Sequence, residues 1–150
     1  MITSDIQVFC IAIKKHGPII GIDFGTKKLG IAMSNPGLTF ALPLLVLDSD
    51  ISKIRPILDR YKPSGIVLGM PINMDGTSGA QVVLIEKFAK KILDSFGLPI
   101  LLQDERLTSR AASNSLKILG LKRKDRDKID DQVAACMLLE SAMSAMQWVD

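Results

Sequence analysis

Three carboxylates in this sequence stand where predicted strands end or a predicted helix begins. Asp23 follows the apolar run 19–22, Glu105 comes just after residues 99–103, and Asp130 opens a long, largely apolar segment. In α/β sheets, binding sites gather at the ends of strands. A carboxylate directly after a buried strand costs free energy unless a cation or strong donors compensate it. The three side chains therefore predict a cation site.

The residue types favour magnesium over zinc. Mg²⁺ prefers carboxylate and water oxygens and keeps coordination positions for substrate phosphate. The chain has a single histidine, His16, and its two cysteines, Cys10 and Cys136, have no close Cys or His neighbour. Two such ions about 4 Å apart can hold the attacking and leaving oxygens of a phosphoryl displacement. We therefore expect Mg²⁺, with Mn²⁺ as the alternative, and hydrolysis of a phosphodiester.

Each carboxylate also has a purely structural interpretation. Glu105 and Asp130 could be acidic residues that favour a helix N-terminus, which is a common use of Asp and Glu. On the local sequence of either residue alone, that interpretation is the better one. Asp23 resists it, because a hairpin turn and not a helix follows it.

Basic and hydroxyl groups accompany these carboxylates. Thr26, Lys27 and Lys28 follow Asp23 and predict a phosphate cradle, although a glycine turn with solvated lysines fits equally well. The net charge of the chain is +3, and segment 122–128 alone supplies that excess with five basic and two acidic residues. This concentration predicts contact with a polyanion, and a solvated loop is the alternative. Its first three residues are Lys122, Arg123 and Lys124.

The segments that must position these groups alternate between the hydrophobic pattern of helices and that of strands. Helices are expected at 3–15, capped by Thr3 or Ser4, and at 49–61, 81–96, 109–119 and 129–148. Strands are expected at 19–23, 29–33, 65–69 and 99–103 and within 39–47. The first two strands should form a hairpin, and 65–69 should be a central parallel strand. The order predicts one domain with a mixed α/β sheet of about five strands flanked by helices.

Bulk properties agree with a single globular domain. At 150 residues, with 47% hydrophobic and 23% charged residues, the chain has the composition of a folded protein with one core. The apolar run 6–13 is too short to cross a bilayer and lacks the flanks of a signal peptide. Both cysteines lie in apolar runs and are expected to be buried thiols. We therefore expect a cytoplasmic protein without a membrane partner.

Four sequence blocks carry a resemblance to a known family. They are 21–27 (GIDFGTK), 69–76 (GMPINMDG), 104–108 (DERLT) and 128–135 (KIDDQVAA). Together, over about residues 19–143, they resemble the YqgF (RuvX) family of pre-16S rRNA nucleases, also described as Holliday junction resolvase-like proteins.

The resemblance implies a ribonuclease H-like fold and a role in processing the 5′ end of pre-16S rRNA during ribosome biogenesis. It places the metal-binding, catalytic acids of the family on Asp23, Glu105 and Asp130. It also implies a substrate path lined by Lys27, Asn73, Arg106 and Thr108, although by composition alone Asn73 is an ordinary turn residue.

Two features depart from the family pattern. Residues 1–18 are predicted to be a helical extension before the nuclease domain at 19–150, where they would cover a sheet face or pair with another chain. Asp131 stands where the family has a small residue. Because consecutive helical residues point about 100° apart, only one of Asp130 and Asp131 can face the site directly.

Three alternatives stay open at this stage. The first is a Holliday junction resolvase that acts on branched DNA, which would need two symmetry-related sites and therefore a homodimer. The second is a nucleic-acid-binding module without catalysis. The third and lowest-ranked is a phosphate-binding lobe like those of sugar kinases and heat-shock ATPases, which need a second lobe that the chain lacks. Phosphate contacts do not distinguish RNA from DNA, and pre-rRNA is favoured on the family resemblance alone.

Overall fold

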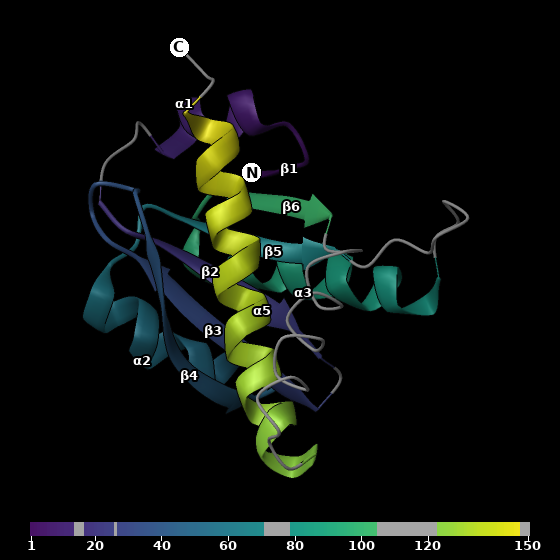
Figure 1. Cartoon of the computed structure of the whole chain (residues 1–150). Coiled ribbons are helices and arrows are strands. Elements are labelled where there is room, and N and C mark those ends of the chain that lie inside the picture. The colour runs from purple at the N-terminus through teal and green to yellow at the C-terminus, as the bar shows by residue number, and fades with distance from the viewer. Residues whose placement is uncertain (14–16, 26, 71–78, 105–122, 148–150) are drawn as a thin grey trace.

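The chain folds around one six-stranded sheet, seen in the computed structural model in Figure 1. The structure describes residues 1–13, 17–25, 27–70, 79–104 and 123–147, with the backbone alone at residues 104 and 123–131. The strands are β1 (Ile2–Thr3), β2 (Ile19–Phe24), β3 (Lys28–Ser34), β4 (Ala41–Asp48), β5 (Gly65–Met70) and β6 (Ile100–Asp104). Their order across the sheet is β1-β6-β5-β2-β3-β4. The first four strands of that order pair in parallel, and β3 and β4 are antiparallel to their neighbours.

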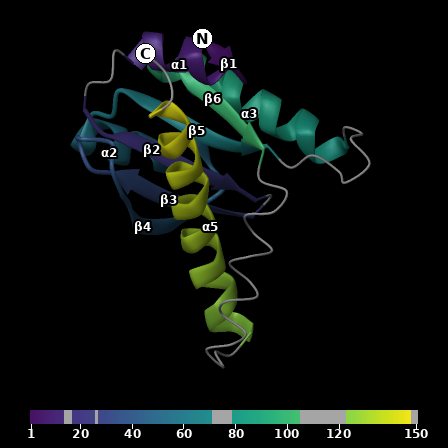
Figure 2. The same cartoon turned by 45° about the horizontal axis from the view of Figure 1, so that its top comes forward.

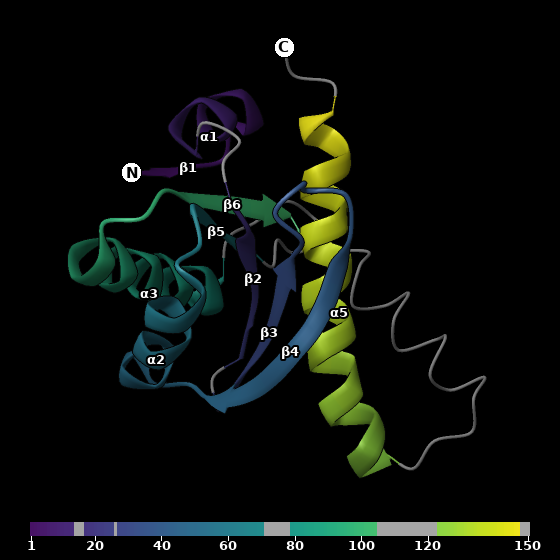
Figure 3. The ribbon, with the colours of Figure 1, turned by 90° about the vertical axis from the view of Figure 1, so that its left-hand side faces the viewer.

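Helices cover both faces of this sheet, as the edge-on view in Figure 3 shows. α2 (Ile51–Tyr61) and α3 (Ala80–Phe96) lie on one face, and α5 (Arg123–Met146) crosses the other. α1 (Ile6–Ile13) packs against α5 through one shared apolar cluster. The C-terminal end of α5 lies toward the end of the sheet where β2 begins, so α5 runs back along β2 in the opposite direction (Figures 1 and 3).

Alternation of side chains along β2 divides the core between the two helix layers. Ile22 belongs to the cluster that includes Phe88 of α3, and the ring centroid of Phe24 lies 5.0 Å from that of Phe88. Ile19 belongs to the second cluster, together with Leu139 of α5. The odd-numbered residues of β2 therefore face α5, and the even-numbered residues face α2 and α3.

The sheet predicted from the sequence is confirmed in its central part. β2 and β3 form the expected hairpin, in which Asp23 lies opposite Gly30. β5 is buried along its whole length and pairs in parallel with both β2 and β6. Such a run is continuously apolar because helices cover both of its faces.

The N-terminal segment differs from the prediction. Its first residues form β1, a sixth strand that pairs in parallel with β6, so the count of about five strands was one too low. Two residues are too few to show a period in the sequence. The helix is capped by Asp5 and not by Thr3 or Ser4, because the Asp5 carboxylate accepts hydrogen bonds from the backbone N–H groups of Gln7 and Val8.

The last helix is longer than predicted. α5 begins at Arg123, so residues 123–128 of the basic stretch form its first turns and not a loop between two helices. Asp130 consequently lies within α5, and the prediction that it opens the helix is wrong. The physical reason is that residues 121–150 contain neither Gly nor Pro, and Lys and Arg are good helix formers. The predicted helix at 109–119 lies outside the described residues.

Within the described part of the chain, no helix is both long enough and apolar enough to cross a membrane. The two cysteines form no disulfide with each other; Cys10 is buried and Cys136 is half-buried. Burial, with a smaller contribution from the Glu140 carboxylate, raises the pKa of the Cys136 thiol to about 11. This thiol is therefore protonated and unreactive at neutral pH.

Candidate active site

The candidate site lies at the edge of the sheet where three parallel strands end. In the register of these strands, Ile22 pairs with Leu68 and Leu68 pairs with Leu102. The arrowheads of β2, β5 and β6 consequently point toward the same edge of the sheet (Figure 2). This carboxyl edge is the usual position of ligand sites in open α/β sheets.

Asp23 is the best-defined residue at the carboxyl edge. It is the next-to-last residue of β2, is partly buried, and has the odd number that places it on the α5 face of the sheet. The strand before it is fully buried from Ile19 to Ile22. The structure therefore places this carboxylate at the end of a buried strand, as the sequence predicted, and on the side of the sheet that carries the last helix.

α5 approaches β2 closely just before Asp23. A Cβ atom added to Gly21 would lie 3.0 Å from the carbonyl oxygen of Ala135 and 3.1 Å from Cβ of Leu139. Ala135 and Leu139 have no exposed surface. Asp130 lies five residues before Ala135 in the same helix, and its side chain is outside the described residues. The structure thus brings the helix that carries Asp130 against the strand that carries Asp23.

Glu105 itself lies outside the described residues, but the strand before it does not. Asp104 is the last residue of β6, and Met70 of β5 pairs with it. Gln103 connects β6 to the last helix, since its Nε2 donates a hydrogen bond to Oγ of Ser141 at 3.3 Å. The sequence contained no signal for this contact, because the two residues are 38 positions apart.

The turn after Asp23 is shaped by a glycine and by an ion pair. A Cβ atom on Gly25 would lie 2.6 Å from the carbonyl oxygen of Lys28, so only glycine fits here. Lys28 Nζ lies 2.6 Å from Oδ1 of Asp48. That hydrogen bond, and then the charge of Lys28, lower the pKa of Asp48. Lys28, which was predicted to bind phosphate, therefore has a carboxylate partner within the protein. The sequence analysis missed this ion pair.

The structure describes only some of the other residues that were predicted to bind substrate. The side chain of Lys27 is exposed, and its carbonyl oxygen accepts a hydrogen bond from the backbone N–H of Ser49. Arg123 and Lys124 lie in the first turn of α5, with their side chains outside the described residues. The remaining predicted residues also lie outside the described ranges: Thr26, Asn73, Arg106, Thr108 and Lys122.

The donor chemistry at the carboxyl edge fits a hard cation. Among the side chains that the structure describes, no three His, Cys, Asp or Glu residues form a group that could hold a metal ion. The side chains of Glu105 and Asp130 lie outside that set. Asp23 is a partly buried oxygen donor, and both of its predicted partners are also carboxylates. Oxygen-only donors suit Mg²⁺ or Mn²⁺ and do not suit zinc.

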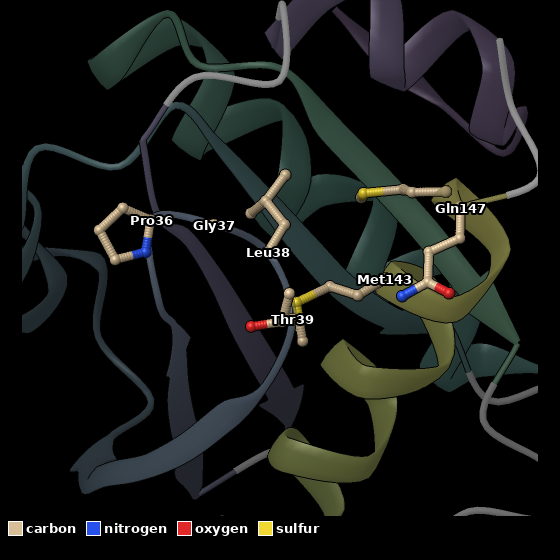
Figure 4. A pocket seen from close by; sticks show the side chains of 7 residues that line it. Pro36, Gly37, Leu38, Thr39, Met143 and Gln147 are labelled. Carbon is tan, nitrogen blue, oxygen red and sulfur yellow. The ribbon is translucent and has the colours of Figure 1, made fainter.

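A pocket of about 270 Å³ lies elsewhere, against the last turns of α5 (Figure 4). None of its lining residues is acidic or basic: Pro36, Gly37, Leu38, Thr39, Met143, Met146 and Gln147. Met143 and Met146 are buried. The pocket therefore offers no acidic or basic side chain for acid–base chemistry.

A mixed sheet in this strand order, with helices on both faces and a carboxylate at the end of β2, defines a ribonuclease H-like α/β protein. Solved structures share this fold. The T. thermophilus RuvC in complex with a Holliday junction substrate aligns with a TM-score of 0.53 at 17% identity, over 87% of this chain and 96% of that chain. The fowlpox virus resolvase in complex with Holliday junction DNA gives 0.54 at 18% identity, over 86% and 98%.

The chain belongs to the RuvX family, whose model, described as Holliday junction resolvase, matches residues 17–145. A protein of Rickettsia akari (strain Hartford) is 45% identical over 98% of this chain and 99% of its own length. One of Rickettsia bellii (strain OSU 85-389) is 42% identical over 97% and 98%. Both are named "Putative pre-16S rRNA nuclease". The family recognised from the four sequence blocks is thus confirmed.

Proposed function

We propose that this protein is a magnesium-dependent nuclease that hydrolyses phosphodiester bonds and processes the 5′ end of pre-16S rRNA. The observation that carries the proposal is the position of Asp23 at the carboxyl edge, on the face where α5 packs directly on β2. Family membership and the names of the Rickettsia relatives support the substrate. Because pre-16S rRNA is processed where ribosomes are assembled, we propose that the protein works in the cytoplasm.

The acids proposed to hold the metal are Asp23, Glu105 and Asp130. The alternation along β6 assigns Leu101 to the α5 side and Ile100 to the opposite side. Gln103 has the parity of Leu101, in agreement with its hydrogen bond to Ser141 of α5. In this proposal Asp23 would hold the metal from the end of β2, on the face that α5 covers, together with Glu105, which follows β6 in the sequence, and Asp130, which belongs to α5.

The proposed mechanism divides the work between these acids and the basic residues. When Mg²⁺ is bound, it supplies a water molecule of lowered pKa and neutralises charge on the phosphate that is attacked. Asp23, Glu105 and Asp130 fix the position of that reaction relative to the sheet. Lys27 and the basic first turns of α5 would hold the flanking phosphates of the backbone. Binding should consequently weaken steeply as salt rises.

The basic residues at the start of α5 are costly for the helix itself. Cations near a helix N-terminus oppose the helix macrodipole, and anions there are favoured. Arg123 and Lys124 lie in that first turn. A helix N-terminus and basic side chains both attract phosphate, which supports a substrate-binding role for this segment.

A junction resolvase is the second candidate. It is favoured by the description of the family and by the two solved structures that contain Holliday junction DNA. Cleavage of a four-way junction at two symmetric positions would require a homodimer. Sedimentation of the protein with and without junction DNA distinguishes this candidate from a single-site rRNA nuclease.

The testing experiment uses two labelled substrates, a pre-16S rRNA 5′-leader fragment and a four-way DNA junction. Each is incubated with Mg²⁺ or EDTA and with the wild type, Asp23→Asn or Asp59→Asn. Asp59 is exposed on α2, on the opposite face of the sheet, and serves as the matched control. Cleavage of the RNA that requires Mg²⁺ and Asp23 but not Asp59 supports the proposal, and cleavage of the junction alone favours the resolvase. If neither substrate is cut and both variants bind like the wild type, the protein is a binding module without catalysis.

A further inference from the structure

Gly21 is a position where α5 packs closely on β2. The atoms that a Cβ at this position would meet are the carbonyl oxygen of Ala135 at 3.0 Å and Cβ of Leu139 at 3.1 Å. Neither atom belongs to the flexible end of a side chain, so neither can rotate away. The helix backbone itself would have to move by a few tenths of an ångström.

This contact lies close to the proposed metal site along β2. Gly21 precedes Asp23 by two residues, which is about 6.6 Å along a strand. The same distance corresponds to about four residues of helix. Because α5 runs in the opposite direction to β2, four residues back from Ala135 lead to Asp131, next to Asp130. From the Gly21 contact, the two aspartates therefore lie along α5 in the direction in which β2 continues to Asp23.

We infer that Gly21 is a positioning residue, which sets the separation between the carboxylate on β2 and the carboxylate on α5 and thereby tunes the proposed site for Mg²⁺. The inference rests on the proposed function. A side chain at position 21 would lift α5 from β2 two residues before Asp23. A glycine keeps the interface at its minimum spacing.

The size of the expected shift is important for Mg²⁺ and much less so for Ca²⁺. Mg²⁺ requires near-ideal octahedral geometry with oxygen ligands at about 2.0–2.1 Å. Ca²⁺ accepts ligands at about 2.3–2.6 Å in flexible arrangements. A displacement of a few tenths of an ångström should therefore weaken Mg²⁺ binding selectively, which is an effect that general destabilisation does not produce.

Gly65 provides a matched control in the neighbouring strand. A Cβ atom there would lie 2.7 Å from Cγ2 of Ile13 and 2.9 Å from Cζ of Phe9. Gly65 is the first residue of β5, at the opposite end of the parallel strands from the carboxyl edge. A substitution at Gly65 should disturb the packing of α1 and leave the spacing at Asp23 unchanged.

The experiment measures metal binding by the full chain without substrate. Thermal unfolding of wild type, Gly21→Ala, Gly65→Ala and Asp23→Asn is followed over a range of MgCl₂ or CaCl₂ concentrations, which yields an apparent dissociation constant for each ion. For Gly21→Ala we expect the Mg²⁺ constant to rise about tenfold, in the range that loss of ligand-orienting contacts produces. Its Ca²⁺ constant should change less than about twofold, and Gly65→Ala should lose stability with both constants unchanged.

The inference is overturned if Gly21→Ala binds Mg²⁺ like the wild type, or if Gly65→Ala loses Mg²⁺ affinity to the same extent. If Gly21→Ala does not fold, Leu139→Ile branches the side chain at the Cβ atom that borders Gly21 from the helix side, and its Mg²⁺ constant decides in the same way. The proposed function fails separately, by the absence of Mg²⁺-dependent cleavage by the wild type. The proposed metal site fails if Asp23→Asn binds Mg²⁺ as tightly as the wild type.

Discussion

The two ends of the parallel strands differ in what their side chains do. At the end where β2 and β5 begin, α1 is buried against the sheet through Phe9, Cys10 and Ile13, and α1 contains no charged residue. At the carboxyl edge, Asp23 lies near the end of a buried strand, and Lys27, Lys28 and Asp48 lie beside the following turn. One end contributes apolar burial and the other carries charge. Stability and chemistry are therefore separated along the same strands, and a substitution at either end should affect one of them alone.

The largest expected effect is on catalysis at the carboxyl edge. Asp23→Asn should lower the Mg²⁺-dependent cleavage rate by about 1,000-fold or more, because a catalytic metal is worth several kcal/mol of transition-state stabilisation. The free energy of unfolding without metal should change far less than the cleavage rate, since Asn has nearly the same size and shape as Asp. Single-turnover cleavage and thermal unfolding in EDTA measure both. A loss of stability comparable to the loss of activity would contradict the separation of the two ends.

The opposite end should show the reverse behaviour. Phe9 has no exposed surface, and Phe9→Ala should lower the free energy of unfolding by about 3–5 kcal/mol through lost burial and a cavity. At a temperature where the variant is folded, its Mg²⁺ half-saturation for cleavage should equal that of the wild type. Urea unfolding supplies the first quantity. Ile11→Ala, at a side chain that is 74% exposed, is the control and should change stability by less than about 0.5 kcal/mol.

The choice between Asp130 and Asp131 sharpens the definition of the carboxyl edge. The family resemblance favours Asp130 as the ligand, and we expect Asp130→Asn to lose about 100-fold in Mg²⁺-dependent rate. Asp131→Asn should stay within about tenfold of the wild type. Cleavage rates at several Mg²⁺ concentrations measure both effects. The reverse order would move the ligand to Asp131, one helical turn before Ala135.

A smaller effect is expected at the ion pair beside the turn. Asp48→Asn leaves the Lys28 ammonium available to a phosphate, so the variant should bind the RNA leader about two- to fivefold more tightly at low salt. The slope of log affinity against log salt should become steeper by up to about 0.9 for one added phosphate contact. Filter binding at several salt concentrations gives both values, with Asp59→Asn as the control. Unchanged affinity would place Lys28 outside the substrate path.

The smallest effect concerns the pH dependence of stability. The pKa of Asp48 is lowered below its ordinary value of 3.8 by the hydrogen bond and charge of Lys28. A group with a depressed folded pKa contributes stability that is present above its unfolded pKa and is lost as pH falls through the folded value. Wild type should therefore lose a small increment of stability below about pH 4 that Asp48→Asn does not have. Because Lys28 and Asp48 are 58% and 64% exposed, that increment should disappear in high salt.

The central sheet could be predicted from the sequence because its strands have strong local signals. The runs of β2 and β5 are apolar, end at turn residues and are too short for helices, and the hairpin after Asp23 followed from its glycine turn. The two-residue β1 had no such signal, and neither did the start of α5 within a charged segment. β1 forms because it pairs with the distant strand β6, and α5 starts early because the helix continues through the charged segment. Local sequence patterns indicate neither effect.

The candidate acids Asp23, Glu105 and Asp130 were proposed from sequence alone. Carboxylates next to strand ends and the family blocks can be recognised one segment at a time. Tertiary structure alone decided the spacing of Gly21 to Ala135, the pairing of Lys28 with Asp48 and the contact of Gln103 with Ser141. Each of these joins segments that are at least 20 residues apart. Their geometry depends on how the helices pack on the sheet, and that packing is a property of the whole core.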